Sequence, residues 1–293
     1  MPRRDKSYAL DQCALYRCGT KKKLLRLLQT TPTKLAELKA ADSLYYRMEK
    51  PKKNGGVRVV YAPRYDLKRI QARLSELLMR VEAPAYLMSP VRGRSNIDNA
   101  AVHRDATAHR LIDIEDFYPS CTATKTAWFF GKVLRCPPDV VAILTWLSTR
   151  DGSLPQGSPA SPILAFLAYR DMWDEIAAIA QRNGNRLTVY VDDVTLSGEV
   201  VLGQTLWDIK QTLLKHGHRT KASKEESRRG TPVAVTGVIL RDGALLLPNV
   251  QHQKRHQLRK ALERMPEGPD RLRIEAAVAG HDETERQIVK RSG

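Results

Sequence analysis

The alternation of apolar and polar residues along the chain is clearest in one short stretch, residues 187–197. Apolar and polar side chains alternate up to Val191, the adjacent carboxylates Asp192 and Asp193 interrupt the run, and a second β-rich segment follows at once. This pattern predicts a β-hairpin with paired acids at its turn. Because aspartate is an ordinary turn residue, the pair alone favours a solvated loop over a functional site.

Two further hairpins are predicted from the same kind of pattern. The β-rich runs 44–48 and 57–63 flank Asn54-Gly55, a dipeptide that strongly favours a tight hairpin turn. Residues 233–240 and 244–247 flank a second turn that contains glycine. Both segments therefore indicate antiparallel strand pairs.

Apolar residues at helical spacing predict helices around these hairpins. Such spacing covers residues 67–81 and 206–214, the segment after Ser161 and most of the chain from Asn249. Thr33 and Ser161 are suited to cap the helices that follow them. The helix after Ser161 is expected to pack on a sheet, because its apolar residues share one face.

The charge of the chain points to a polyanionic partner. The 293 residues include 49 Lys and Arg against 32 Asp and Glu, a formal net charge of +17. Such an excess favours binding to nucleic acid first and to an anionic membrane surface second. Because we find no apolar run long enough to cross a membrane and no N-terminal signal, we expect a cytoplasmic protein.

The cysteines and histidines do not indicate a metal centre. The four cysteines are Cys13, Cys18, Cys121 and Cys136. No two of them form the C-x2-C pair of a zinc site, so we expect them to be reduced and structural. His252 and His256 have the spacing of a helical metal site, but no third ligand lies nearby. Their surroundings are basic, as expected of a helix that faces phosphate.

A lone carboxylate stands within another predicted strand. Asp113 lies among Leu111, Ile112 and Ile114, where burying an unpaired charge would be costly. A positive group should therefore lie against it. The residues alone leave two solutions open, which are a salt bridge from a basic side chain and a divalent metal ion.

Two polar segments also have possible functional roles. Residues 154–162 form a dense turn cluster that leads into a helix, and the backbone amides of residues 156–158 could line a substrate cleft. Asn99 and His103 lie four residues apart and are expected on one face of a helix. Both side chains could instead serve the local backbone alone.

In their order along the chain, these segments resemble the motifs of reverse transcriptases, and within them the bacterial retron type. Tyr190–Asp193 matches the Y-x-D-D signature, Leu154–Pro159 matches the L-P-Q-G-S-P block, and residues 111–114 with 117–120 match the aspartate block that precedes both. The resemblance covers Tyr45 to Leu247 well and both termini weakly.

Two shorter elements narrow the resemblance to the retron type. Asn99 and His103 fit its N-A-x-x-H element, and Val235, Thr236 and Gly237 fit its V-T-G element.

Three positions depart from the family pattern. Val191 stands where retron enzymes commonly carry alanine, Phe117-Tyr118 replaces a Phe-Phe pair, and Lys221 stands where asparagine is usual. The aromatic character is kept and no metal-binding position is missing. In the basic stretch 215–224, the alignment leaves open whether Lys221 or Lys224 matches a basic residue of the family.

The resemblance implies an α+β fold of the right-hand polymerase class. An antiparallel palm sheet packed by helices and interleaved with the fingers is expected over residues 1–247. A short helical thumb is expected over residues 248–293, with no further domain after it.

The resemblance also implies an active site for nucleotidyl transfer. Two Mg²⁺ ions, about 4 Å apart in such sites, would be held by Asp113, Asp192 and Asp193, with the Ile114 carbonyl as an extra ligand. Metal binding then becomes the favoured explanation for Asp113. Lys224 would protonate the pyrophosphate leaving group.

Four residues are implied to contact the incoming deoxynucleotide. Arg58 would bind the triphosphate, and Gln156 and Gly157 would line the nucleotide pocket. Tyr118 would stack beneath the sugar and exclude a 2′-hydroxyl.

The partners implied are a cognate structured non-coding RNA and its RNA–DNA product, primed from a guanosine 2′-hydroxyl. A role in defence against phage, with a separate effector protein, is also implied.

A group II intron-like or diversity-generating enzyme is an alternative, which the V-T-G element and the lack of an extension after Gly293 disfavour. A catalytically silent RNA-binding scaffold is a second alternative, and the intact aspartate triad disfavours it.

Overall fold

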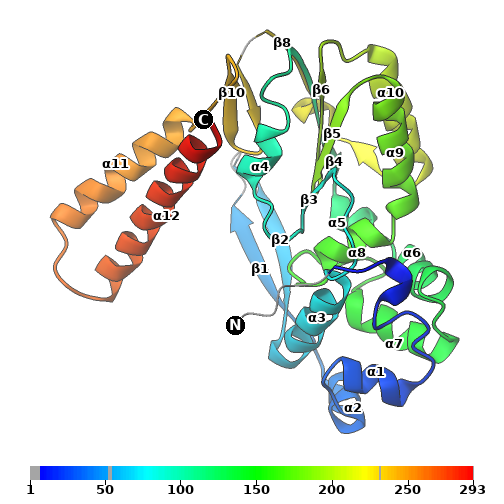
Figure 1. Cartoon of the computed structure of the whole chain (residues 1–293). Coiled ribbons are helices and arrows are strands. Elements are labelled where there is room, and N and C mark those ends of the chain that lie inside the picture. Colours follow the sequence, from blue (N-terminus) through cyan, green and yellow to red (C-terminus); the bar gives the residue numbers. More distant parts are fainter. Residues whose placement is uncertain (1–6, 52–54, 231, 293) are drawn as a thin grey trace. The chain divides into compact units, whose positions relative to one another are not determined.

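The computed structural model describes residues 7–51, 55–230 and 232–292 (Figure 1). The chain divides into two compact units. The first unit comprises residues 1–85, 115–176 and 212–219, and the second comprises residues 86–114, 177–211 and 220–293. The mixture of helices with largely antiparallel sheets confirms the predicted α+β class. The predicted division at residues 247 and 248 stays a prediction.

A mixed sheet forms the centre of the second unit. Its order is β3-β5-β6-β4-β7, and β8 also pairs with β4. The strands are β3 (Leu87–Ser89), β4 (Ala108–Glu115), β5 (Arg186–Tyr190), β6 (Asp193–Gly198), β7 (Arg219–Thr220) and β8 (Glu226–Arg229). The pairs β5–β6, β4–β6 and β4–β8 are antiparallel, whereas β3 and β5 are parallel. The predicted hairpin with acids at its turn is confirmed as β5–β6.

A three-stranded meander follows in the same unit, with strands β9 (Val233–Val235), β10 (Val238–Arg241) and β11 (Ala244–Leu246). The expectation of one strand over residues 233–240 was wrong. Thr236 and Gly237 adopt φ of 45° and 82°, so the chain reverses between β9 and β10. The positive φ pair suits a tight hairpin turn.

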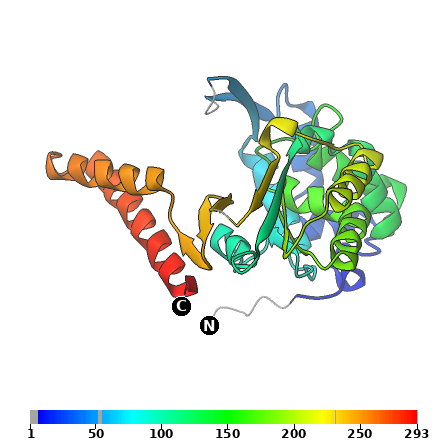
Figure 2. The ribbon, with the colours of Figure 1, turned by 90° about the horizontal axis from the view of Figure 1, so that it is seen from above.

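Helices α4 (Asn96–Ala101), α11 (Asn249–Glu263) and α12 (Pro269–Ser292) complete the second unit. The antiparallel pair α11–α12 appears in orange and red in Figure 2. Ion pairs join the two helices, including Arg259 to Asp282 at 2.8 Å. A buried cluster seals the meander against α4 and α12, and its members are Ile97, Ala100, Val233, Val235, Val238, Leu240, Leu245 and Ile288.

The first unit is mainly helical and carries the hairpin β1 (Tyr45–Pro51) and β2 (Val57–Pro63). Its helices are α1 (Lys21–Leu27), α2 (Pro32–Ala40), α3 (Tyr65–Leu78), α5 (Phe117–Ser120), α6 (Ala123–Trp128), α7 (Pro138–Ser148) and α8 (Ser161–Leu167). Helices α9 (Arg170–Arg182) and α10 (Gly203–Lys215) contribute residues to both units. The Asn54 half of the predicted Asn54-Gly55 turn lies outside the described residues.

The positions predicted for two helix caps, Thr33 and Ser161, were wrong by one or two residues. The Thr31 hydroxyl, not Thr33, caps α2 by accepting the Lys34 N–H at 3.1 Å. Ser161 is the first residue of α8, and its hydroxyl donates to the Pro155 carbonyl at 2.8 Å. At α2 a nearby threonine therefore takes over the capping role, whereas the N-cap of α8 is Ala160, which has no capping side chain.

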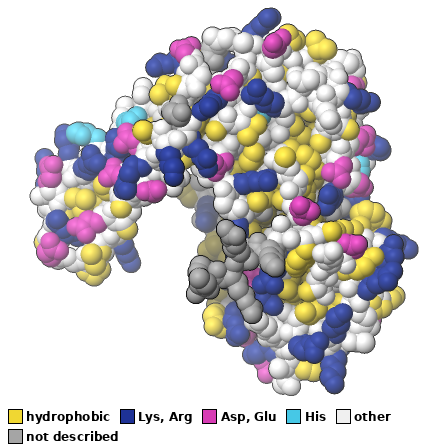
Figure 3. Space-filling model, viewed as in Figure 1, with side chains coloured by type: hydrophobic (Ala, Val, Ile, Leu, Met, Phe, Trp, Pro, Cys, Tyr) yellow, Lys and Arg dark blue, Asp and Glu magenta, His cyan; other side chains and the backbone are white. Residues whose placement is uncertain are grey.

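Lys and Arg side chains are distributed widely over the surface. Figure 3 shows them, in dark blue, over the α11–α12 pair and over the helices of the first unit.

All four cysteines are buried and free, as predicted. Within the described residues, no helix is both long enough and apolar enough to cross a membrane.

One glycine in the first unit fits only because it has no side chain. Gly157 adopts φ of 120°, and an added Cβ would lie 2.8 Å from the Tyr61 carbonyl oxygen. We predict that Gly157→Ala destabilises the protein by about 1–3 kcal/mol, because the left-handed backbone and the β2 backbone both resist a side chain. Thermal unfolding measures this change. Gly203→Ala is the control, since a Cβ there meets nothing within 4 Å.

Candidate active site

The three predicted metal-binding aspartates come together in the sheet of the second unit. Asp113 on β4 and Asp193 on β6 are direct cross-strand partners. Asp192 lies in the two-residue turn between β5 and β6, and its carbonyl accepts the Ile114 N–H at 3.0 Å. The strand register therefore brings residues separated by almost eighty positions into one carboxylate group.

The turn that carries Asp192 is strained. Val191 adopts φ of 61°, which is a rare conformation for a β-branched residue. The Tyr190–Asp193 pair closes the turn on one side, and the Ile114–Asp192 hydrogen bond holds it to β4. Such strain persists only where the surrounding structure fixes the backbone.

The positive group beside Asp113 is Lys224. Its ammonium donates a hydrogen bond to the Asp113 carboxylate, which is only 11% exposed. Lys221 contributes its backbone N–H to the Asp113 carbonyl at 2.9 Å. The salt bridge that the sequence left open is therefore present, and a lysine forms it.

The carboxylates repel one another. Desolvation, together with repulsion from Asp192 and Asp113, raises the pKa of Asp193 to about 6, and Lys224 opposes this rise. Asp193 lies at the exposed start of β6, where the neighbouring carboxylates repel its charge across the strand pair. Among the described residues, no three His, Cys, Asp or Glu side chains are arranged as ready ligands of one ion. The hard oxygen donors and the repulsion that remains between them nevertheless fit a divalent cation such as Mg²⁺.

The residues predicted to contact a nucleotide all lie in the first unit. The Tyr61 N–H of β2 donates to the Gln156 carbonyl at 3.1 Å, and Gly157 lies against the Tyr61 backbone. The exposed Arg58 lies on the same strand, three residues earlier. The glycine-bearing turn and the strand with Arg58 are thus bonded side by side.

Tyr118 lies on α5, the short helical turn that follows β4 in sequence. Its ring is half-buried, and its centroid lies 5.6 Å from that of Phe117.

The two elements that match the retron type are bonded to each other. Asn99 Nδ2 donates to Thr236 Oγ1 at 3.1 Å, and Asn96 Nδ2 donates to the Thr236 carbonyl at 3.1 Å. Thr236 Oγ1 in turn donates to the Asn96 carbonyl at 3.0 Å. Because Asn99 and Val235 are buried, their side chains hold the second unit together rather than offer a surface to a ligand.

His103 braces the β5–β6 hairpin from within. Its ring nitrogens lie 2.7 Å from the hydroxyls of Ser197 on β6 and Thr188 on β5. The expectation that His103 shares a helical face with Asn99 was wrong, because α4 ends at Ala101. The turn beyond α4 instead directs the imidazole into the sheet, where it is fully buried.

Two residues of the first unit were missed by sequence reasoning. Arg150 stacks on Tyr61, with its guanidinium carbon 3.3 Å from the ring centroid. His218 is fully buried within a segment that looked merely basic. Gly217, directly before His218, is a typical helix-ending residue and was the available signal that the chain turns inward there.

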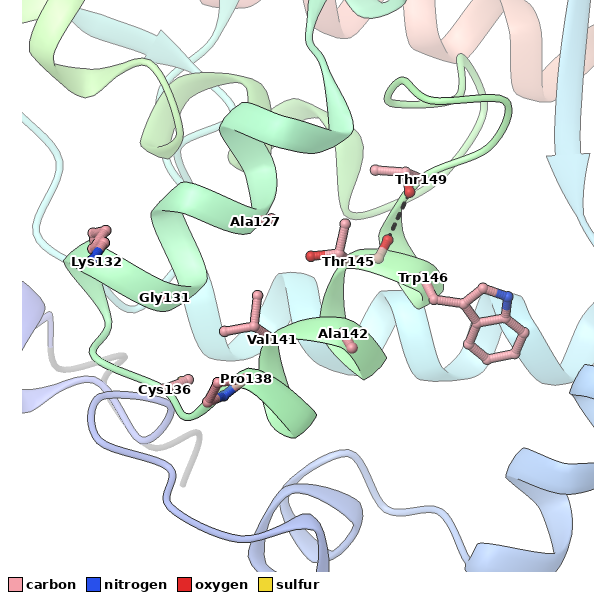
Figure 4. Close-up of a pocket in the computed structure, with 10 residues that line it drawn as sticks. All are labelled: Ala127, Gly131, Lys132, Cys136, Pro138, Val141, Ala142, Thr145, Trp146 and Thr149. Carbon is pink, nitrogen blue, oxygen red and sulfur yellow. Dashed lines mark hydrogen bonds between the residues drawn. The ribbon is translucent and has the colours of Figure 1, made fainter.

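A separate apolar pocket of about 610 Å³ also lies in the first unit (Figure 4). Residues at the end of α6, in the following π-helical turn and on α7 line it, among them Gly131, Val141 and Trp146. None of the predicted site residues lines this pocket, so it is not the candidate active site.

Comparison with known proteins identifies the family of the chain. Residues 50–240 match the family model described as reverse transcriptase (RNA-dependent DNA polymerase). The chain therefore belongs to the reverse transcriptase family. Within that family it is similar to bacterial retron enzymes, as the sequence motifs predicted.

Two retron relatives illustrate the similarity. The retron Se72 reverse transcriptase of Salmonella heidelberg is 28% identical over 71% of this chain and 56% of the relative. The retron Ec86 reverse transcriptase of Escherichia coli is 33% identical over 54% of this chain and 50% of the relative. The chain thus spans about half the length of the curated relatives that it matches.

Among solved structures, a foamy viral protease-reverse transcriptase in complex with double-stranded DNA aligns with a TM-score of 0.46 and 16% identity. The alignment covers 81% of this chain and 37% of the viral chain.

The buried His103 predicts a pH-dependent stability. Burial, with repulsion from His109 and Arg186, lowers the pKa of His103 to about 3. In the unfolded chain the imidazole takes up a proton below its ordinary pKa of about 6.5. Stability is therefore full above that pH and is lost as the pH falls toward 3, by about 1.4 kcal/mol per pH unit.

Chemical denaturation at several pH values measures this loss. Between pH 6 and pH 4, we expect His103→Gln to reduce the slope of the free energy of unfolding against pH by the contribution of one proton, about 1.4 kcal/mol per pH unit. His256→Gln, at an exposed position of α11, is the control and should leave the slope unchanged. An unchanged slope in His103→Gln would contradict the assignment of a neutral, buried imidazole.

Proposed function

We propose that the chain is an RNA-directed DNA polymerase of the retron type. The observation that carries the proposal is the strand register that makes Asp113 and Asp193 cross-strand partners, with Asp192 in the adjoining turn. Membership of the reverse transcriptase family supports the same conclusion. Carboxylates grouped in this way are typical ligands for the divalent cations of nucleotidyl transfer.

Asp113, Asp192 and Asp193 are proposed to hold two Mg²⁺ ions, with the Ile114 carbonyl as a further ligand. When bound, such ions activate the attacking hydroxyl and stabilise the triphosphate with its leaving group. The repulsion that raises the pKa of Asp193 supports cation binding, because a cation would relieve it.

Lys224 is proposed as the acid that protonates the pyrophosphate leaving group. Its ammonium is held at Asp113 and is 52% exposed, so it can reach a group that forms beside this carboxylate. Lys221 contacts the same residue through its backbone N–H. This difference supports Lys224 over Lys221 as the residue that protonates the leaving group.

Four residues of the first unit are proposed to contact the deoxynucleotide. Arg58 is exposed on β2, and its planar guanidinium suits two parallel hydrogen bonds to a phosphate. Gln156 and Gly157 are proposed to line the nucleotide pocket, since Gly157 is exposed in the turn that is bonded to the strand with Arg58. Tyr118 is proposed to stack beneath the sugar and to exclude a 2′-hydroxyl.

The proposed template is a cognate structured non-coding RNA, which also supplies the primer through a 2′-hydroxyl and so yields a branched RNA–DNA product. The matched retron relatives and the net charge of +17 support an RNA partner. We further propose that residues 1–247 form fingers and palm, that residues 248–293 form a thumb, and that the protein acts with a separate effector in cytoplasmic defence against phage.

The polymerase proposal is tested by DNA synthesis on co-purified RNA with deoxynucleotides and Mg²⁺. We expect synthesis by the wild type, loss of at least about 10³-fold in the Asp192→Asn, Asp193→Asn double variant, and loss on chelation of the metal. Asp242→Asn is the matched control, because this exposed aspartate occupies the β10–β11 turn and asparagine tolerates its φ of 52°.

The product also tests the priming proposal. DNA that stays covalently attached to a ribonucleotide through a 2′-linkage after RNase treatment would support it. Unbranched DNA grown from a 3′-hydroxyl would favour the group II intron-like or diversity-generating alternative. Absence of synthesis by the wild type on its own RNA would overturn the enzyme proposal in favour of an RNA-binding scaffold.

The proposed role of Tyr118 as a gate, that is, a ring that excludes a 2′-hydroxyl, predicts a change in sugar selectivity. We expect Tyr118→Ala to raise incorporation of ribonucleotides relative to deoxynucleotides by about tenfold or more, since the ring would no longer exclude the 2′-hydroxyl. Single-nucleotide kinetics measure kcat/KM for each sugar. Selectivity equal to that of the wild type would remove Tyr118 from this role.

A further inference from the structure

His218 is buried because of the way in which α10 ends. Gly217 adopts φ of 86°, and the His218 N–H donates back to the Leu213 carbonyl at 2.9 Å. This left-handed glycine stops the helix and turns the chain inward. The imidazole is consequently fully buried, although charged residues surround it in the sequence.

The hydrogen bonds of Ser120 fix the tautomer of His218. The Ser120 hydroxyl has one proton, which it donates to the Phe117 carbonyl at 2.8 Å. The contact of 2.7 Å between Ser120 Oγ and His218 Nδ1 therefore requires that Nδ1–H is the donor. Burial lowers the pKa of His218 to about 4, which keeps the ring neutral at pH 7.

The same imidazole contacts two aromatic rings. Its centroid lies 4.6 Å from that of Tyr169 and 5.6 Å from that of Phe117. The Tyr169 hydroxyl donates to the Ser120 carbonyl at 3.2 Å and accepts the Thr122 N–H at 3.1 Å. His218 and Tyr169 therefore bond to the hydroxyl and the carbonyl of Ser120, and His218 also contacts the Phe117 ring.

These contacts converge on α5, the short turn that carries Tyr118. A single helical turn has little stability of its own, and this one begins after Asp116 in a left-handed conformation with φ of 43°. The Phe117 ring contacts both Tyr118 and His218, with 5.6 Å between centroids in each case. The backbone that carries Tyr118 therefore lies between two residues, Phe117 and Ser120, that His218 contacts.

We propose that His218 is a positioning residue for sugar selection: by holding Ser120 and Phe117 it fixes the turn from which Tyr118 meets the nucleotide sugar. The inference rests on the proposed gate role of Tyr118. It also gives a role to Ser120, the last residue of the Phe117–Ser120 motif. His218 contacts no substrate itself and acts only through α5.

The test compares kcat/KM for deoxynucleotide and ribonucleotide in single-nucleotide incorporation. His218→Phe keeps a ring of similar size but removes the Nδ1–H donor. We expect it to lower the preference for deoxynucleotide by about fivefold while the protein stays folded. Ser120→Ala removes the acceptor of the same bond and should shift the preference in the same direction.

Two comparisons separate positioning from general loss of structure. In a Tyr118→Ala background, His218→Phe should change the preference no further, because both variants act through one ring. His216→Phe, two residues away and beside Glu175, is the matched control and should leave the preference unchanged.

The outcomes distinguish the inference from the gate proposal. If Tyr118→Ala alters the preference but folded His218→Phe and Ser120→Ala do not, His218 has no positioning role. If Tyr118→Ala itself leaves the preference unchanged, the gate proposal fails and the inference fails with it. If His218→Phe does not fold, Ser120→Ala, which removes only one hydroxyl, decides the matter.

Discussion

The arrangement of the second unit depends on the pairing of β4 with β6. This pairing makes Asp113 and Asp193 neighbours across the sheet, and their charges must be balanced. A sheet does not gather like charges without compensation. Here the compensation comes from Lys224, whose segment is also pinned to the Asp113 backbone. The strands before and after the turn, and the short segment that delivers Lys224, are therefore organised around one concentration of negative charge.

The sequence predicted much of this arrangement from local patterns. The β5–β6 hairpin, the strand with Asp113 and the long helices follow from hydrophobic periodicity, which reports burial directly. The grouping of Asp113 with Asp192 and Asp193 came from the family motifs, since strand register over such a separation depends on the whole sheet.

The missed features depend on contacts that no local pattern encodes. No local pattern indicated that His103 and His218 are buried, yet each is turned inward at the end of a helix and meets a hydroxyl more than ninety residues away. The split of residues 233–240 into two strands depends on positive φ at Thr236, which a β-branched residue rarely adopts. Thr236 accepts it because Asn96 and Asn99 satisfy its polar groups.

Helix α4 and the turn that follows it connect three parts of the second unit. Asn99 binds the turn of the meander, and His103, just past the end of the helix, binds both strands of the β5–β6 hairpin. The same helix packs in the cluster that includes Ile288 of α12. One short segment therefore contacts the meander, α12 and the β5–β6 hairpin, so that these three parts of the second unit are held to one another through it.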